Sequence, residues 1–151
     1  MKKILVTALI LMLGILLSAS RIKNFDKLMK ALRAGQEVSI VIEYGNCILI
    51  SDNEEITPPD AIGGMPVDVW EYFAPMSIGN PKAFVVFSQT KLINYAGFIY
   101  NYAKIKISDD NSVEITAQYA NSQTFELEMD ETFFTEINNG KNTGALFIFK
   151  D

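Results

Sequence analysis

The residues of this chain that could do chemistry are its carboxylates, a lone cysteine and a few aromatic side chains. The chain has no histidine and a single cysteine, Cys47. Without histidine, the Ser-His-Asp and Cys-His arrangements that activate a nucleophile cannot form, and metal sites built on imidazole are excluded with them. No glycine-rich phosphate-binding motif is present. Gly63-Gly64 is too short for one and is better explained as a turn or bulge before a strand.

The polar segment between residues 51 and 61 is the best candidate for a calcium site, because oxygen-rich loops bind calcium. Its acidic residues are Asp52, Glu54, Glu55 and Asp60. They lack the spacing of an EF-hand, and Pro58-Pro59 stiffens the middle of the segment. A solvated acidic loop is therefore the simpler interpretation, and we predict that the protein uses no metal and no cofactor.

A second group of residues could line a ligand cleft. Asp68 and Glu71 could serve as acid and base, but an odd spacing puts them on opposite faces of a strand. Trp70 shares a face with Asp68, and aromatic rings beside a carboxylate can form a binding surface. We name Trp70, Tyr100 and Tyr102 as candidate cleft residues, with core packing as the alternative.

Cys47 has two interpretations. Free cysteine is often buried as a small hydrophobic residue, and Cys47 begins the apolar run Cys47–Ile50. A single cysteine in an exported protein could instead pair with another chain. A catalytic role lacks an identifiable base.

Residues 1–20 resemble a secretory signal peptide. Lys2 and Lys3 precede the apolar stretch Ile4–Leu17, and small residues follow it, so we expect cleavage between Ser20 and Arg21. As a helix the apolar stretch would span roughly 20 Å, which is short of the roughly 30 Å hydrocarbon core. We therefore expect a periplasmic or secreted bacterial protein with no stable membrane span after cleavage, rather than a membrane anchor.

The mature chain, residues 21–151, has the size of one domain and an acidic balance. Removing Lys2 and Lys3 from the 13 basic residues leaves 11 against 18 acidic ones, a net charge of −7. Nucleic-acid binding needs a basic face that neutralises phosphates, so this balance argues against it.

The stretch from Gly97 to Ala120 predicts an antiparallel hairpin with its turn at Ser108–Ser112. Paired residues must share a face, and one register keeps both faces consistent. That register pairs Ile107 with Val113, Ile105 with Ile115, Ala103 with Ala117, Lys106 with Glu114 and Lys104 with Thr116. We also expect the base of the hairpin, near Gly97, to be covered on both faces.

The other elements are an amphipathic helix at residues 24–34 and several short strands. The helix has Asn24 as its N-cap and Gly35 at its end. The strands are expected at residues 37–43, 47–50, 67–73, 84–87, 124–129 and 145–149, and in the fifth Phe125, Leu127 and Met129 should point inward. Short connections favour antiparallel neighbours. The expected fold class is α+β, mainly β: a curved antiparallel sheet or incomplete barrel with one N-terminal helix.

Several short segments resemble the VirK family of exported, virulence-associated bacterial proteins. The likeness is carried by Leu28–Val38, Glu43–Cys47 and Pro59–Gly64, and residues 84–89 and the hairpin fit the same layout. The resemblance implies export and involvement with a host, and it brings no catalytic residues. We favour an exported, non-enzymatic binding or accessory protein whose partner is an unknown protein or a small apolar ligand. The alternatives are a lipocalin-like carrier of a small apolar ligand and a histidine-free hydrolase that uses paired carboxylates.

Overall fold

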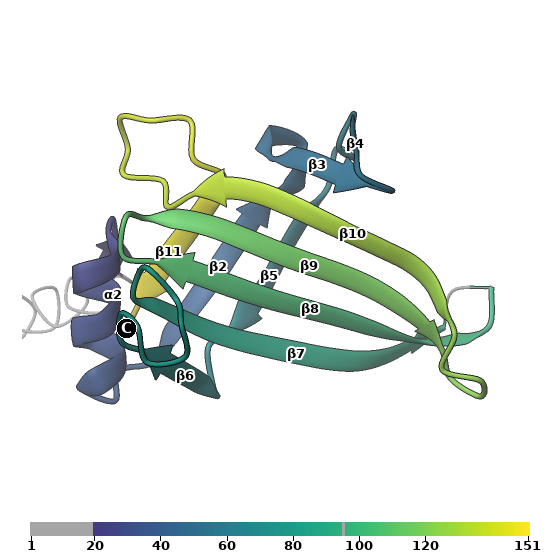
Figure 1. Cartoon of the computed structure of the whole chain (residues 1–151), viewed down its shortest axis with the longest axis horizontal. Helices are drawn as coiled ribbons and strands as arrows, with labels where there is room; N and C mark the ends of the chain where they lie inside the picture. The colour runs from purple at the N-terminus through teal and green to yellow at the C-terminus, as the bar shows by residue number, and fades with distance from the viewer. Residues whose placement is uncertain (1–19, 95) are drawn as a thin grey trace, which may run out of the picture.

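The computed structural model describes residues 20–94 and 96–151, which form two antiparallel sheets and one α-helix (Figure 1). The four-stranded sheet has the order β1 (Ser20–Ile22), β11 (Leu146–Lys150), β2 (Val38–Glu43) and β5 (Ile62–Pro66). The seven-stranded sheet has the order β4 (Glu54–Ile56), β3 (Ile48–Ser51), β10 (Leu127–Glu136), β9 (Ser112–Asn121), β8 (Phe98–Ser108), β7 (Phe84–Asn94) and β6 (Trp70–Phe73). The sheets do not close into a barrel. The predicted fold class, α+β and mainly β with one helix, is confirmed.

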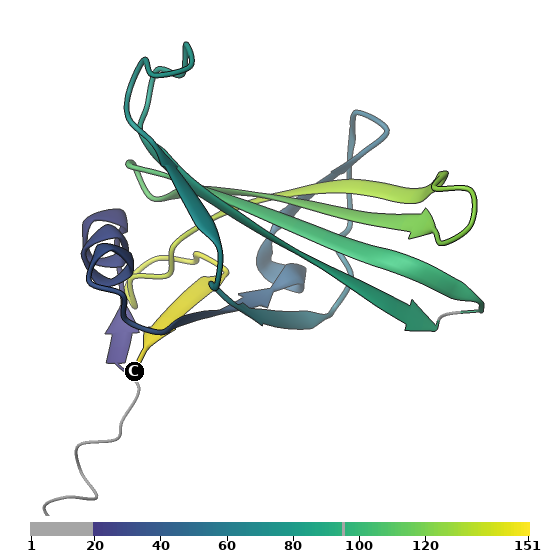
Figure 2. The same cartoon turned by 90° about the horizontal axis from the view of Figure 1, so that it is seen from below.

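Helix α2 (Phe25–Arg33) begins and ends where the sequence predicts. The Asn24 side chain accepts a hydrogen bond from the Lys27 N–H at 3.0 Å, and Gly35 leaves the helix with a φ of +67°. Its buried residues are Phe25, Leu28, Met29, Ala31 and Leu32. So short a helix is marginal alone, and this apolar face holds it against one end of the space between the two sheets (Figure 2).

The hairpin β8–β9 has the predicted register. Lys106 lies opposite Glu114, with 3.8 Å between Nζ and Oε2, and Ile105 and Ile107 on the other face are fully buried. The neighbouring strand β7 continues this pattern, because its Val85 pairs with Ile107 of β8. One face of the long strands therefore points into the core, and we call it the inner face of the seven-stranded sheet.

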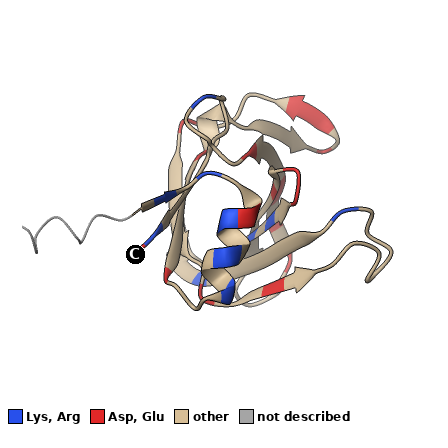
Figure 3. Ribbon diagram, turned by 90° about the vertical axis from the view of Figure 1, so that its left-hand side faces the viewer, with Lys and Arg blue, Asp and Glu red and all other residues tan. Residues whose placement is uncertain are grey.

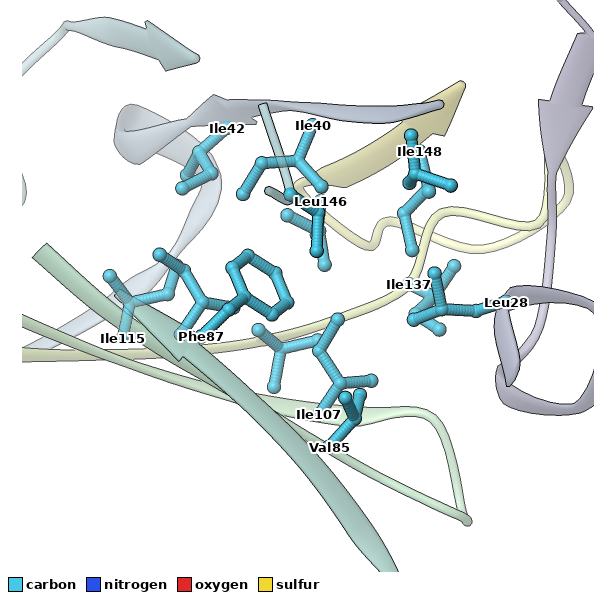
Figure 4. Close-up of a cluster of buried hydrophobic side chains, with 14 of the residues drawn as sticks. Leu28, Ile40, Ile42, Val85, Phe87, Ile107, Ile115, Ile137, Leu146 and Ile148 are labelled. Carbon is cyan, nitrogen blue, oxygen red and sulfur yellow. The ribbon is translucent and has the colours of Figure 1, made fainter. Parts of the chain in front are cut away.

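The core is a single cluster built from both sheets and the helix (Figure 4). Ile40 and Ile148 of the four-stranded sheet face Phe87 and Ile107 of the seven-stranded sheet, and Leu28 of α2 completes the cluster. Fully burying a side chain of this size contributes about 1.5–3 kcal/mol. The helix and both sheets therefore depend on one another for stability.

Two segments differ from the prediction near the edges of the sheets. The expected loop at residues 51–61 contains the short strand β4. Gly63 and Gly64, expected to form a turn or bulge, lie inside β5 and pair with Ile42 and Val41. Glycine is needed there because the neighbours are close: a Cβ on Gly64 would lie 3.0 Å from the carbonyl oxygen of Ile40.

The prediction of an inward-facing Phe125 and Leu127 is wrong. Both side chains are exposed, and only Met129 of the three lies on the inner face. The reason is a register shift between Leu127 and Met129, which pairs Leu127 with Ala120 and so puts it on the outer face. A bulge of this kind interrupts the two-residue alternation from which the prediction was made.

The outer face at the base of the hairpin is also uncovered, contrary to expectation, since Phe98 is exposed there. No helix in the described part of the chain is long and apolar enough to cross a membrane. The predicted signal peptide lies outside the described residues, apart from Ser20 at the start of β1.

Candidate functional site

The structure does not bring the three predicted cleft residues together. Trp70 pairs with Phe87, and Phe87 pairs with Ile105, so Trp70 lies on the inner face. Tyr100 and Tyr102 are each an odd number of residues from Ile105 on β8, which places them on the outer face. A cleft made by all three side chains cannot form, because the sheet itself separates them.

Trp70 does line a cavity, together with its neighbour Asp68. The cavity has a volume of about 460 Å³, within the usual range of small-molecule sites. Its lining residues are Leu32, Gly35, Gln36, Glu37, Val38, Ser39, Pro66, Val67, Asp68, Trp70 and Asp151. We call it the Trp70 cavity. It lies where the C-terminal end of α2, the start of β2 and the link between β5 and β6 meet.

Backbone hydrogen bonds bring these distant segments to one place. The Val67 N–H donates to the carbonyl oxygen of Val38 at 2.8 Å, which carries Asp68 to the start of β2. The Asp151 N–H donates to the carbonyl oxygen of Glu37 at 3.3 Å. Three acidic residues that are remote in sequence therefore line one cavity.

The lining of the Trp70 cavity combines an aromatic ring with carboxylates. Trp70 is half-buried and packs against the core, whereas the Glu37 and Asp68 side chains are exposed. A tryptophan face attracts a cation through its ring quadrupole, and carboxylates accept hydrogen bonds from ammonium or guanidinium groups. This arrangement suits a small organic cation.

The carboxylates do not form a metal site in the part of the chain that the structure describes. No three or more Asp, Glu or Cys side chains among residues 20–94 and 96–151 are grouped so that they could hold a metal ion. Figure 3 shows the acidic residues distributed over separate elements. The segment 51–61, the candidate from the sequence, contributes no such group.

A second feature joins two segments that sequence analysis considered separately. Tyr44 begins the 3-10 helix η2 (Tyr44–Asn46), and its N–H donates to the carbonyl oxygen of Ala61 at 2.9 Å. Its ring packs edge-on against Phe133 at 4.9 Å between centroids, and burial raises the pKa of Tyr44. A cavity of about 170 Å³ opens beside it between the two sheets, and Gln89 and Lys91 also line this cavity. In the sequence, only Gly63-Gly64 indicated that another segment packs closely against the backbone here.

Cys47 follows η2 and is buried, with only 7% of its surface exposed. Its Sγ donates to the carbonyl oxygen of Glu43 at 3.7 Å, and burial raises the pKa of the thiol. The interpretation of Cys47 as a small buried hydrophobic residue is confirmed.

Comparison with known proteins gives one family and one similar fold. A family model described as VirK protein matches residues 21–125. The crystal structure of a VirK family protein from Legionella pneumophila superposes with a TM-score of 0.61 and 14% sequence identity, over 85% of this chain and 98% of that one. At this identity the likeness concerns the fold alone. None of the curated proteins matches the chain.

Proposed function

The chain belongs to the VirK family, and we propose that it is an exported, non-enzymatic binding protein that holds a small organic cation in the Trp70 cavity. The observation that carries this proposal is the lining of the cavity, where the half-buried ring of Trp70 shares a space of about 460 Å³ with Glu37 and Asp68. The family's association with virulence suggests a role in contact with a host.

Export is supported by the sequence of the leader. Lys2 and Lys3 precede the apolar stretch, and the family match begins at residue 21, directly after the expected cleavage site. We propose the periplasm or the medium as the place where the protein works.

A cation fits the Trp70 cavity better than a purely apolar ligand does. Burying an apolar ligand beside Glu37 and Asp68 would remove water from these carboxylates without giving them a partner, which is costly. A primary amine or guanidinium group would instead pair with them while its carbon chain lies against Trp70 and Pro66.

Binding suits these carboxylates better than hydrolysis. A general acid works best when its pKa is raised by burial or by a neighbouring charge. The Glu37 and Asp68 side chains are exposed to solvent, so they are better placed to hold a cation than to transfer a proton in a closed site. Glu71 points to the other face of β6 and cannot join them.

The test uses Trp70 as its own reporter, because the chain contains no other tryptophan. Purified exported protein is titrated with putrescine and with spermidine while tryptophan emission is recorded. We expect a saturable change in emission. The affinity for the amine should fall about tenfold in Asp68→Asn, which is the effect of losing one ion pair beside an aromatic face. The matched control is Glu71→Gln, which removes a carboxylate directly beside Trp70 in the sequence but on the opposite face of the strand.

The titration has outcomes that contradict the proposal. Unchanged emission with both amines would reject an amine ligand. Equal weakening in Asp68→Asn and Glu71→Gln would show that general charge, and not the cavity, attracts the amines. Binding of a long-chain fatty acid without binding of amines would favour the lipocalin-like carrier instead.

A further inference from the structure

The cavity beside Tyr44, between the two sheets, has no part in the proposed function. Its volume is about 170 Å³, and one water molecule takes up roughly 30 Å³ of the liquid. The space therefore suits a ligand of a few carbon atoms and not an extended chain. We call it the Tyr44 cavity.

The floor of the Tyr44 cavity is the inner face of the seven-stranded sheet, where large apolar side chains give way to small and polar ones. The core row across β7, β8 and β9 consists of Phe87, Ile105 and Ile115, and the next row consists of Gln89, Ala103 and Ala117. Two alanines therefore stand where the core row has two isoleucines. Their short side chains leave open space between the sheets.

Three polar side chains of β7 and β8 line this space together. Gln89 and Lys91 are two residues apart on one face of β7, and Asn101 pairs with Lys91 across to β8. Such neighbours have Cα atoms roughly 5–7 Å apart, so one small ligand can reach all three. In the part of the chain that the structure describes, none of these side chains makes a hydrogen bond or ion pair with another residue. Their polar groups are therefore available to a ligand.

The charge of the Tyr44 cavity is opposite to that of the Trp70 cavity. Among the described residues that line the Tyr44 cavity only Lys91 is charged, whereas those of the Trp70 cavity include three acids and no base. Glu131, which pairs with Ala117 on β10, shares the inner face but does not line the cavity. An ammonium group beside two amides donates hydrogen bonds to an anion. One positive charge matches a carboxylate better than a doubly charged phosphate.

The other side of the Tyr44 cavity, formed by β2, β5 and η2, is apolar. Ile42 and Met65 line it, and both are buried. The ring of Tyr44 completes this side and is held in place by Phe133. Such a surface covers a short carbon chain.

We propose that the Tyr44 cavity binds a small organic acid with a hydroxyl beside its carboxylate and a short apolar body. Lys91 pairs with the carboxylate, and the amides of Gln89 and Asn101 bind the hydroxyl, because an amide both donates and accepts hydrogen bonds. The carbon chain lies against Tyr44 and Met65. This site is separate from the Trp70 cavity, because no residue lines both.

The test is an NMR titration of the isotope-labelled exported protein with two ligands of nearly the same shape. One is α-hydroxyisovalerate, and the other is its uncharged amide, α-hydroxyisovaleramide. The side-chain NH2 signals of Gln89 and Asn101 report directly on a ligand in the Tyr44 cavity. We expect saturable shifts of both signals with the acid. The amide should bind about tenfold more weakly, because it lacks the charge that pairs with Lys91.

Lys91→Gln tests the charge without disturbing the fold. The Lys91 side chain is exposed and has no ion-pair partner among the described residues, so this variant should melt at the temperature of the unmodified protein. Its affinity for the acid should fall about tenfold, whereas its affinity for the amide should not change. The matched control is Lys104→Gln, the same substitution on the outer face of the neighbouring strand β8. This control should bind the acid normally.

Three results would overturn the proposal: no saturable shift with the acid, equal affinities for the acid and the amide, or an unchanged affinity for the acid in Lys91→Gln. Shifts confined to the indole N–H signal of Trp70 would place the acid in the Trp70 cavity and would also reject it. The amine titration described above tests a different cavity with different residues, so either proposal can fail alone.

Discussion

The ring of Tyr44 lies directly against Gly63, where an added Cβ would come within 2.9 Å of Cε2. The two residues belong to different segments, η2 and β5, which the Tyr44 N–H joins through the carbonyl oxygen of Ala61. The ring cannot easily move away, because it also packs against Phe133. This contact fixes the 3-10 turn onto the edge strand β5.

Gly63→Ala should therefore destabilise the fold by about 1–3 kcal/mol, the usual cost of overpacking a tight site. Urea unfolding measures the change. The control is Gly45→Ala, in the same turn, where an added Cβ would have its nearest neighbour at 3.6 Å. That variant should be as stable as the unmodified protein, and equal losses in the two variants would contradict the contact.

Ile105→Asp should destabilise the protein far more than Lys106→Asp. Ile105 is fully buried, and burying an unpaired charge costs more than a small domain can sustain. Lys106 is partly exposed and pairs with Glu114 across the strands, so reversing its charge should cost about 1 kcal/mol or less. The midpoints of urea unfolding measure the stability of both variants, and similar losses of stability would contradict the register.

The Asp110 carboxyl should titrate well below its ordinary range. The Lys82 ammonium donates a hydrogen bond to it, Ser112 donates two more, and together they lower the pKa of Asp110 to about 2. Carbon-detected NMR titration measures this value. Lys82→Met should raise it toward the ordinary range, whereas Lys91→Met, a change toward the other end of β7, should leave it unaltered.

The sign of the linked stability follows from the direction of this shift. The pKa of Asp110 is lower in the folded state than in the unfolded state, so its contribution is fully present above about pH 4 and is lost as the pH falls toward 2. The contribution should be small, because water screens an exposed pair. Asp110→Asn should make the acid side of the stability profile slightly flatter, and a steeper profile would contradict the assignment.

The exported protein should begin at Arg21 or an adjacent residue. The charged start, apolar stretch and small residues of the leader predict this boundary. N-terminal sequencing of protein recovered outside the cytoplasm measures it directly. An intact Met1 on membrane-bound protein would show that the leader is retained as an anchor.

Several elements could be predicted because local patterns determine them. The helix follows from Asn24, Gly35 and the apolar stripe between them, and these signals lie within one short segment. The register of β8–β9 follows because only one pairing places Ile105 opposite Ile115 and Lys106 opposite Glu114. A two-residue alternation with complementary charges leaves little freedom.

Tertiary structure decided which residues meet. The sequence could place Asp68 beside Trp70, but only the hydrogen bond from Val67 to Val38 brings Asp68 to the same cavity as Glu37. Alternation assigns residues to two faces of a strand without saying which face is inner. The pairing of β6 with β7, and of β7 with β8, settled that Trp70 and Tyr100 are on opposite sides of the sheet, and one register shift turned Leu127 outward. Such choices depend on contacts between segments far apart in the chain, so no local pattern in the sequence contains them.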